Sequence, residues 1–139
     1  MSIQFALVPL FFQILLVFIL MIWMGIKRQS ALRRGEVHPR DIALREPKWP
    51  PKAMQVANCF SNQFEIPVLF YVVTILALMT RQADLLFVLL SWVFVILRYI
   101  HAFIHTTSNR VPRRGLVYGL GVVIVFALWV ELALHLYLP

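Results

Sequence analysis

The feature that most constrains the fold is the division of the chain into four uninterrupted apolar blocks. The first block, residues 1–26, contains no charged side chain, and the others cover roughly residues 57–80, 85–104 and 116–138. Each is about the 20 residues that a helix needs to cross the hydrocarbon core of a bilayer. Strands of a membrane barrel alternate over shorter segments of about 10 residues, so the blocks favour helices.

These blocks predict an all-α membrane protein with a single domain over residues 1–139, folded as a four-helix transmembrane bundle. Because the first block has no preceding basic residue and no small-residue cleavage site, we expect it to remain as a helix and not to be a cleaved signal peptide. Pro67 predicts a modest kink about one turn before it in the second helix. The expected helices are at about 3–26, 53–80, 85–105 and 116–138, with a loop over 27–52.

The positive charges gather in two of the three connections. Of 13 basic residues, eight lie between Lys27 and Lys52, and Arg110, Arg113 and Arg114 lie in the third connection. The positive-inside rule therefore places loops 27–52 and 106–115 in the cytoplasm and both termini on the opposite side. Topology and contact with anionic membrane lipids explain the net charge of +7, and no nucleic acid is expected as a partner.

Two of the apolar blocks carry matching polar faces. On a helix, residues spaced i, i+4, i+7 or i, i+3, i+7 share one face. Ionisable groups inside membrane spans are costly, so they point to a bundle interior or a wet cavity and indicate function. The faces consist of Asn58, Asn62 and Glu65 in the second block and Arg98, His101 and His105 in the third.

The two faces also match in depth. Glu65 lies 16 residues before Arg81, and Arg98 lies 14 residues after Asp84. At about 1.5 Å per residue these separations are about 24 Å and about 21 Å, which puts both charges in the cytoplasmic third of the bilayer. The basic segment 109–115 follows directly. A negative ligand from the cytoplasm is thus expected to meet a polar pocket bordered by guanidinium groups, which bind carboxylates in bidentate fashion.

Two structural or inorganic interpretations compete with a ligand site. Glu65 and Arg98 could form a buried ion pair that fixes helix register, with Asn62 as an interhelical hydrogen-bonding group. His101 and His105 could hold a metal ion with Glu65. Because there is no clear third ligand and Arg98 is adjacent, we expect no metal there.

Three other polar residues of the spans are expected to be structural. Cys59 is the only cysteine, so it forms no internal disulfide, and a small buried side chain is the expected role. Glu131 and His135 lie four residues apart near the outer end of the fourth helix. We expect them to be an interfacial pair that extends to the headgroups and not a site.

Three short motifs together resemble the MAPEG family, the membrane-associated proteins in eicosanoid and glutathione metabolism. They are Asn62-x-x-Glu65, Arg98-x-x-His101 and Arg110-x-Pro112-x-Arg114, and the resemblance covers nearly the whole chain. It implies a MAPEG-like homotrimer that binds glutathione between subunits near the cytoplasmic side. It further implies Arg114 as the catalytic group that activates the thiol, and a glutathione site built from Asn62, Glu65, Arg98, His101, His105, Arg110 and Arg28.

The chain departs from the eicosanoid-forming branch at four positions of this site. Two further arginines of helix two are replaced by Asn58 and Ser61, a tyrosine by His105, and a hydroxyl donor after Arg114 by Gly115. The sequence therefore resembles a divergent bacterial-type member, and we expect it in a bacterial inner membrane.

The resemblance implies a glutathione-dependent transferase or peroxidase that acts on lipophilic electrophiles or hydroperoxides from the bilayer, with glutathione as co-substrate. The alternative is a non-catalytic protein of the same fold: a membrane scaffold, a subunit, or a lipid- or quinone-binding protein. The missing arginines of helix two favour this alternative, and the grouping of so many polar residues at one depth favours the enzyme.

Overall fold

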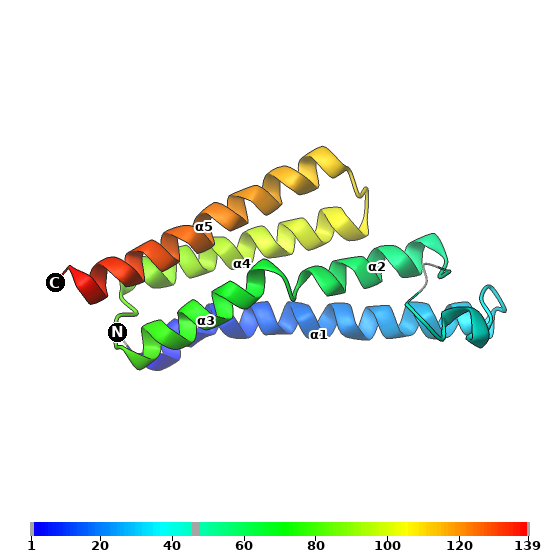
Figure 1. Ribbon diagram of the computed structural model, residues 1–139, viewed down its shortest axis with the longest axis horizontal. Coiled ribbons are helices and arrows are strands. Elements are labelled where there is room, and N and C mark those ends of the chain that lie inside the picture. The colour runs from blue at the N-terminus through cyan, green and yellow to red at the C-terminus, as the bar shows by residue number, and fades with distance from the viewer. Residues whose placement is uncertain (1, 46–47, 139) are drawn as a thin grey trace.

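The chain folds into an elongated bundle of helices (Figure 1), described by a computed structural model over residues 2–45 and 48–138. Four helical stretches of the described residues are long and apolar enough to cross a membrane, the second being the broken stretch Pro51–Met79. The predicted all-α four-helix membrane bundle is thus confirmed. In chain order the elements are α1 (Ile3–Arg33), the 3₁₀ turn η1 (Pro39–Ile42), α2 (Pro51–Asn62), α3 (Ile66–Met79), α4 (Leu85–Thr106) and α5 (Val111–Tyr137).

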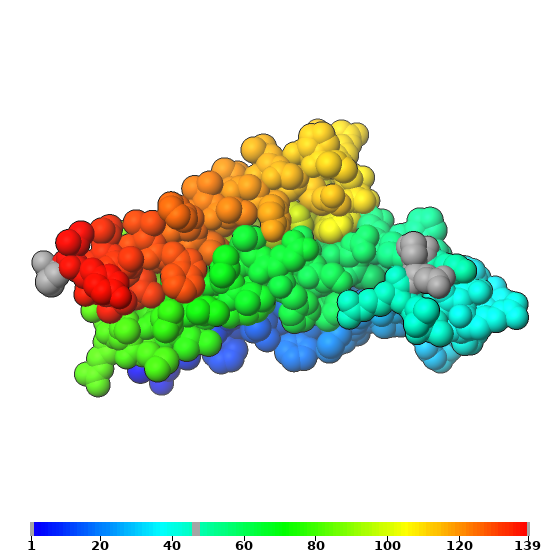
Figure 2. Space-filling model, viewed as in Figure 1, coloured from blue at the N-terminus to red at the C-terminus, as the bar shows by residue number. Residues whose placement is uncertain are grey.

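The two ends of the bundle contain different connections between the helices. The start of α1, the α3–α4 turn and the end of α5 lie at one end, and the segment after α1 lies at the other, as Figures 1 and 2 show. The α4–α5 turn lies toward the same end as the segment after α1. The two basic connections therefore share one end, as the sequence predicts.

Helix α1 is longer than the predicted helix over 3–26. It continues to Arg33 because residues 27–34 contain neither proline nor glycine, and a helix that has left the membrane does not need apolar side chains. It ends where Gly35 adopts a positive φ of 68°. The Gly35 and Glu36 amides then donate to the Leu32 and Ala31 carbonyls over 3.2 and 3.0 Å, as in a glycine C-cap.

The second span is broken in two, which is a larger distortion than the predicted modest kink, at the predicted place. Pro67 has no amide hydrogen, so the Gln63 carbonyl has no donor four residues later. The chain tightens into 3₁₀-type turns, with the Gln63 amide donating to the Phe60 carbonyl over 3.0 Å and the Glu65 amide to the Asn62 carbonyl over 3.3 Å. Pro67 then occupies the first turn of α3, where a proline is well tolerated. The break places Asn62 and Glu65 on either side of irregular backbone.

Helix α5 begins at Val111, five residues earlier than the predicted start at 116. Pro112 lies in its first turn, because the fixed φ of proline suits that position and its missing amide needs no partner there. The predicted loop 106–115 is therefore a short turn around Asn109, whose φ is 50°, followed by a helical turn. As a result Arg113 and Arg114 lie on a helix and not in a flexible connection.

The turn between α3 and α4 is as short as the sequence predicts, so the two helices run antiparallel. Arg81 takes a left-handed φ of 59°. Asp84 caps α4, since its Oδ1 accepts a hydrogen bond from the Phe87 amide over 2.9 Å. This hydrogen bond is the main reason that the pKa of the Asp84 carboxyl group lies below its ordinary value.

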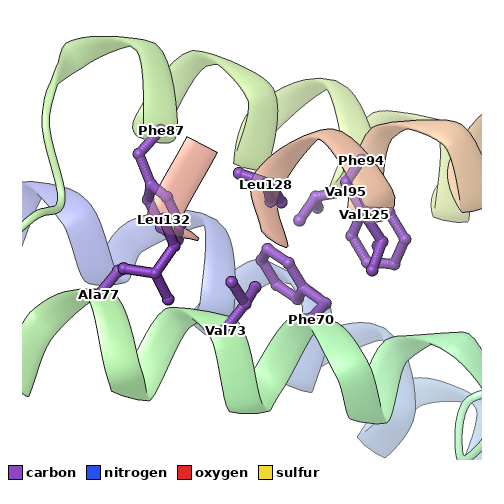
Figure 3. Close-up of a cluster of buried hydrophobic side chains, with 9 residues drawn as sticks. All are labelled: Phe70, Val73, Ala77, Phe87, Phe94, Val95, Val125, Leu128 and Leu132. Carbon is purple, nitrogen blue, oxygen red and sulfur yellow. The ribbon is translucent and has the colours of Figure 1, made fainter. Parts of the chain in front are cut away.

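The main apolar core lies in the half of the bundle that contains the termini. Figure 3 shows it where α3, α4 and α5 meet. Within it, Phe70 and Phe94 pack with ring centroids 4.7 Å apart. The core consists of Phe70, Val73, Ala77, Phe87, Phe94, Val95, Val125, Leu128 and Leu132. Helix α5 packs on α3 and α4 here, and its N-terminal half diverges from α2 (Figure 1).

Two glutamines that belong to none of the sequence motifs join α1 to the break in the second span. The Gln13 side-chain amide donates to Gln63 Oε1 over 3.0 Å, and Gln63 Nε2 donates to the Cys59 carbonyl over 3.0 Å. Both side chains are fully buried. A buried amide pair of this kind fixes one helix against another.

We expect Gln63→Leu to lower the free energy of unfolding by about 1 kcal/mol, because it leaves the buried Gln13 amide without its acceptor. Reversible unfolding in mixed detergent micelles measures this. Gln29→Leu, at an exposed position of the same helix as Gln13, is the control and should change little. Equal stability of the two variants would contradict the assigned role.

Candidate functional site

Side-chain hydrogen bonds fasten the start of α2 to the end of α4. Gln55 Nε2 donates to the carbonyls of His105 over 2.7 Å and Thr107 over 3.2 Å, and Lys52 Nζ donates to the Thr106 carbonyl. The last carbonyls of a helix have no partners within it, so these donors satisfy them and hold the two helices together. The two predicted polar faces are thereby held side by side.

Between α2, α4 and the start of α5 lies a cleft of about 480 Å³, within the range usual for small-molecule sites. We call it the polar cleft. Its lining includes four of the predicted binding residues and the predicted catalytic residue. The lining residues are Asn58, Ser61, Asn62, Glu65, His101, His105, Arg114, Gly115 and Tyr118.

Asn62 connects the two polar faces. Its Oδ1 accepts a hydrogen bond from Arg98 Nη2 over 2.5 Å, and its Nδ2 donates to Glu65 Oε2 over 3.3 Å. Arg98 is 1% exposed and does not line the cleft, whereas the Glu65 side chain is exposed. Among the described residues, Glu65 and Arg98 form no direct ion pair. Asn62 therefore links Arg98 to Glu65 through hydrogen bonds, in place of the direct ion pair that was considered as a lock on helix register.

Both histidines are buried beside the cleft, one turn apart on α4. Their ring centroids are 5.5 Å apart, and the His101 ring lies 5.7 Å from that of Tyr118. The Nδ1 atom of each ring is buried and has no hydrogen-bond partner among the described residues. Buried polar atoms are normally paired, so these nitrogens are available to a ligand or water.

Tyr118 also lines the cleft, although none of the sequence motifs pointed to it. Its hydroxyl donates to Glu65 Oε2 over 3.4 Å, and the Arg98 guanidinium lies 5.9 Å from its ring centroid. The signal was present, because Tyr118 is four residues after Arg114 and therefore on the same face of α5. It was hidden because the predicted helix began only at 116.

The three remaining predicted cations differ in position. Arg114 lines the cleft, half-buried, and its Nη1 donates to Asn109 Oδ1 over 2.7 Å. Arg110 is exposed, immediately before α5, and is not part of the lining. Arg28 lies in a second pocket of about 750 Å³, where its guanidinium is 5.1 Å from the Trp49 ring centroid. Asn58 and Ser61 line both pockets, so the two adjoin across α2.

The structural roles expected for the other polar residues are borne out only in part. Cys59 is fully buried, with its Sγ 4.0 Å from the Ala102 carbonyl oxygen, and is a packing residue as expected. Glu131 was expected to extend to the headgroups, and this is wrong, because it is 7% exposed. The turn at Asp84 and the packing of α5 on α4 cover it.

Four membrane-crossing helices with a polar cleft between them define an integral, multi-pass membrane protein. The model of the MAPEG family matches residues 6–134, nearly the whole chain. The protein therefore belongs to the MAPEG family, and the resemblance seen in its motifs is confirmed. No curated protein and no solved structure matches the chain significantly.

Proposed function

We propose that the protein is a glutathione-dependent transferase or peroxidase that acts on lipophilic electrophiles or hydroperoxides dissolved in the bilayer. The observation that carries this proposal is the convergence of Asn62, Glu65, His101, His105 and Arg114 on one cleft. Glutathione offers two carboxylates, an ammonium group and a thiol, and the cleft offers groups of the opposite character. Many members of the family are glutathione transferases.

The polar residues have distinct roles in this proposal. Glu65 binds the ammonium group of glutathione, because its carboxylate is exposed in the cleft. Arg98 acts through Asn62, which it holds by a hydrogen bond. His101 and His105 donate or accept hydrogen bonds from the wall of the cleft. Arg28 and Arg110 bind carboxylates from the edges, since an extended tripeptide lying across α2 reaches the adjoining pocket that holds Arg28.

The chemistry needs only an activated thiol and an apolar second substrate. Arg114 favours the thiolate of glutathione, which is the nucleophilic form, and the proton passes to solvent. The sulfur attacks the electrophilic carbon, and the leaving group departs with the bonding electrons. With a hydroperoxide, the sulfur attacks the terminal oxygen and the alcohol leaves; a second glutathione then converts the sulfenic acid to the disulfide and water.

The proposal includes the assembly and the orientation implied by the resemblance. The protein forms a homotrimer in a bacterial inner membrane, with glutathione between neighbouring subunits. The polar cleft opens near the cytoplasmic end, where the basic segments lie, and the termini face the other side.

A non-catalytic membrane protein of the same fold is the second candidate, as a scaffold, a subunit or a lipid-binding protein. It is favoured by the uncharged Asn58 and Ser61, which line the cleft at the positions of the two missing arginines. Calorimetry with detergent-purified protein and glutathione distinguishes the two. Saturable binding with the ultraviolet band of a thiolate supports the enzyme, and no binding at millimolar glutathione supports the second candidate.

We expect Glu65→Gln to weaken glutathione binding about tenfold, because the ammonium group loses its negatively charged acceptor and keeps a hydrogen bond to a neutral amide oxygen only. Thermal stability should change little, since the side chain is exposed. Glu36→Gln, at an exposed position after α1, is the matched control. A loss of stability with unchanged affinity would instead assign Glu65 to a structural lock.

A further inference from the structure

A second cluster of polar residues lies at the opposite end of the bundle from the polar cleft. Asp84 immediately precedes α4, and Glu131 and His135 lie one turn apart near the end of α5. The α3–α4 turn and the end of α5 meet at this end of the molecule (Figure 1). One oxygen of each carboxylate and one imidazole nitrogen all lie within 4.8 Å of one another. The closest ion pair joins His135 Nε2 and Asp84 Oδ2 at 3.8 Å.

Glu131 lacks the partners that a buried carboxylate needs. The residue is 7% exposed, and both of its carboxylate oxygens are buried without a hydrogen-bond partner among the described residues. An ionised carboxylate removed from water in this way is strongly destabilised unless a cation compensates it. Asp84, the nearest acidic neighbour, increases the need for a compensating cation because it adds a second negative charge. His135 balances at most one of the two charges.

Two carboxylates and an imidazole are ligands of the kind that Zn²⁺ and related divalent ions take. At Zn–N and Zn–O distances of about 2.0–2.2 Å, ligand atoms around a tetrahedral ion lie roughly 3.3 Å apart. The observed separations, up to 4.8 Å, are somewhat wider, and small side-chain rotations close them. The exposed His135 is free to make such a rotation, and Asp84 presents its Oδ2 to the site while its Oδ1 caps α4. Glu131 is fixed by its surroundings.

We propose that Asp84, Glu131 and His135 form a binding site for a divalent transition metal ion of the zinc class. The ion compensates the buried carboxylate of Glu131 and joins the α3–α4 turn to the end of α5. Three protein ligands leave a fourth position for water. Glu131 is 17 residues from Arg114 along α5, or about 26 Å, so this site is separate from the polar cleft and does not depend on the proposed glutathione chemistry.

A proton is the competing occupant of the site. A protonated Glu131 could share its hydrogen with Asp84, which would also remove the buried charge. The two occupants predict different effects of Glu131→Gln, because glutamine imitates the protonated acid but is a poor metal ligand. The metal proposal requires a loss of zinc affinity, and the proton alternative predicts no zinc affinity to lose.

The test is titration of metal-free, full-length protein in detergent with Zn²⁺, by calorimetry, after removal of any polyhistidine tag. We expect one ion per chain and a rise of about 9 °C in the thermal midpoint when zinc is in 100-fold excess over its dissociation constant. His135→Ala and Glu131→Gln should each weaken binding at least tenfold. Asp84→Asn should do the same while keeping the cap of α4, since asparagine caps as well as aspartate. It therefore tests the site in a chain that folds.

Control variants distinguish this site from the histidines of the polar cleft. His101→Gln and the exposed His38→Ala should leave zinc binding unchanged. Co²⁺ in place of Zn²⁺ should give visible absorption bands of a four-coordinate ion that vanish in His135→Ala. The proposal would be overturned by the absence of binding at about 10⁻⁴ M zinc, the weak end of specific metal sites. It would also be overturned by zinc binding that survives Glu131→Gln and His135→Ala, or by zinc binding that is lost in His101→Gln.

Discussion

Arg114→Ala is expected to lower kcat/KM for glutathione conjugation at least ~100-fold, while the protein still folds and assembles. Arg114 is the arginine that lines the polar cleft, and a fixed cation beside the sulfur is what favours the thiolate over the thiol. A free thiol has a pKa of about 8.5, so little of it is ionised at neutral pH without such help. Loss of one preorganised group that stabilises developing or reacting charge commonly costs a factor of about 10²–10³.

The fold should tolerate this substitution. Arg114 lies in the first turn of α5 and is only half-buried, and its hydrogen bond goes to the side chain of Asn109 in the adjacent turn. The apolar core that holds α5 is at the far end of the helix. Turnover with chlorodinitrobenzene, the ultraviolet band of the bound thiolate, and gel filtration together measure rate, ionisation and assembly.

Arg113→Ala is the matched control, because it removes the same charge from the neighbouring, exposed position of the same turn. We expect it to keep activity within about twofold, since an exposed charge outside the cleft is screened by salt. Equal losses in both variants would mean that the basic end acts only through its overall charge. Full activity of Arg114→Ala would remove Arg114 from the mechanism, and loss of assembly in Arg114→Ala would favour the structural alternative.

The architecture could be predicted from the sequence because each span leaves a direct composition signal. The end of α1 and the start of α5 could not, because an apolar block marks where a chain lies in the membrane and not where its helix stops. Helix α1 continues through polar residues until Gly35 ends it. Helix α5 begins at the turn before Pro112, inside a segment that looks like a basic loop. The two ends of α4 lie within one residue of the predicted ends, and Pro67, which removes a backbone donor inside a span, marked the place of the break in the second span.

The residues of the candidate site could be predicted where their spacing along a helix alone determines which face they share. Asn62, Glu65, His101 and His105 meet in one cleft because their spacing puts them on facing sides of two antiparallel helices. Which residue contacts which could not be predicted, since this depends on side-chain reach across the helices. Thus Arg98 contacts Asn62 and not Glu65. The burial of Glu131 also escaped prediction, because the packing of a distant turn determines it.

Asn62→Ala is expected to lower the free energy of unfolding by about 3 kcal/mol, the largest stability effect that we predict for a single substitution. Arg98 is 1% exposed, and its Nη2 donates to Asn62 Oδ1. Its Nε is already buried without a partner among the described residues. Removing Asn62 therefore leaves a buried guanidinium with little compensation, which typically costs about 3–5 kcal/mol.

Removal of the charge itself should be far less harmful. Replacing the members of a buried polar pair with apolar side chains of similar size is often neutral, because no charge is left to solvate. We therefore expect Arg98→Leu to cost about 1 kcal/mol, and the double variant Asn62→Ala/Arg98→Leu to be more stable than Asn62→Ala alone. The ranking of the three variants by free energy of unfolding therefore tests whether the uncompensated charge of Arg98 is what destabilises Asn62→Ala.

A double-mutant cycle by reversible unfolding in mixed micelles measures this coupling. Gln13→Leu is a useful reference, because it removes a fully buried but uncharged group of another helix and should be additive with Arg98→Leu. Strict additivity of Asn62→Ala and Arg98→Leu would show that the hydrogen bond contributes nothing. A coupling of about 2 kcal/mol would show that Arg98 is tolerated within the bundle because Asn62 compensates it, and that Arg98 in turn fixes the orientation in which Asn62 faces the polar cleft.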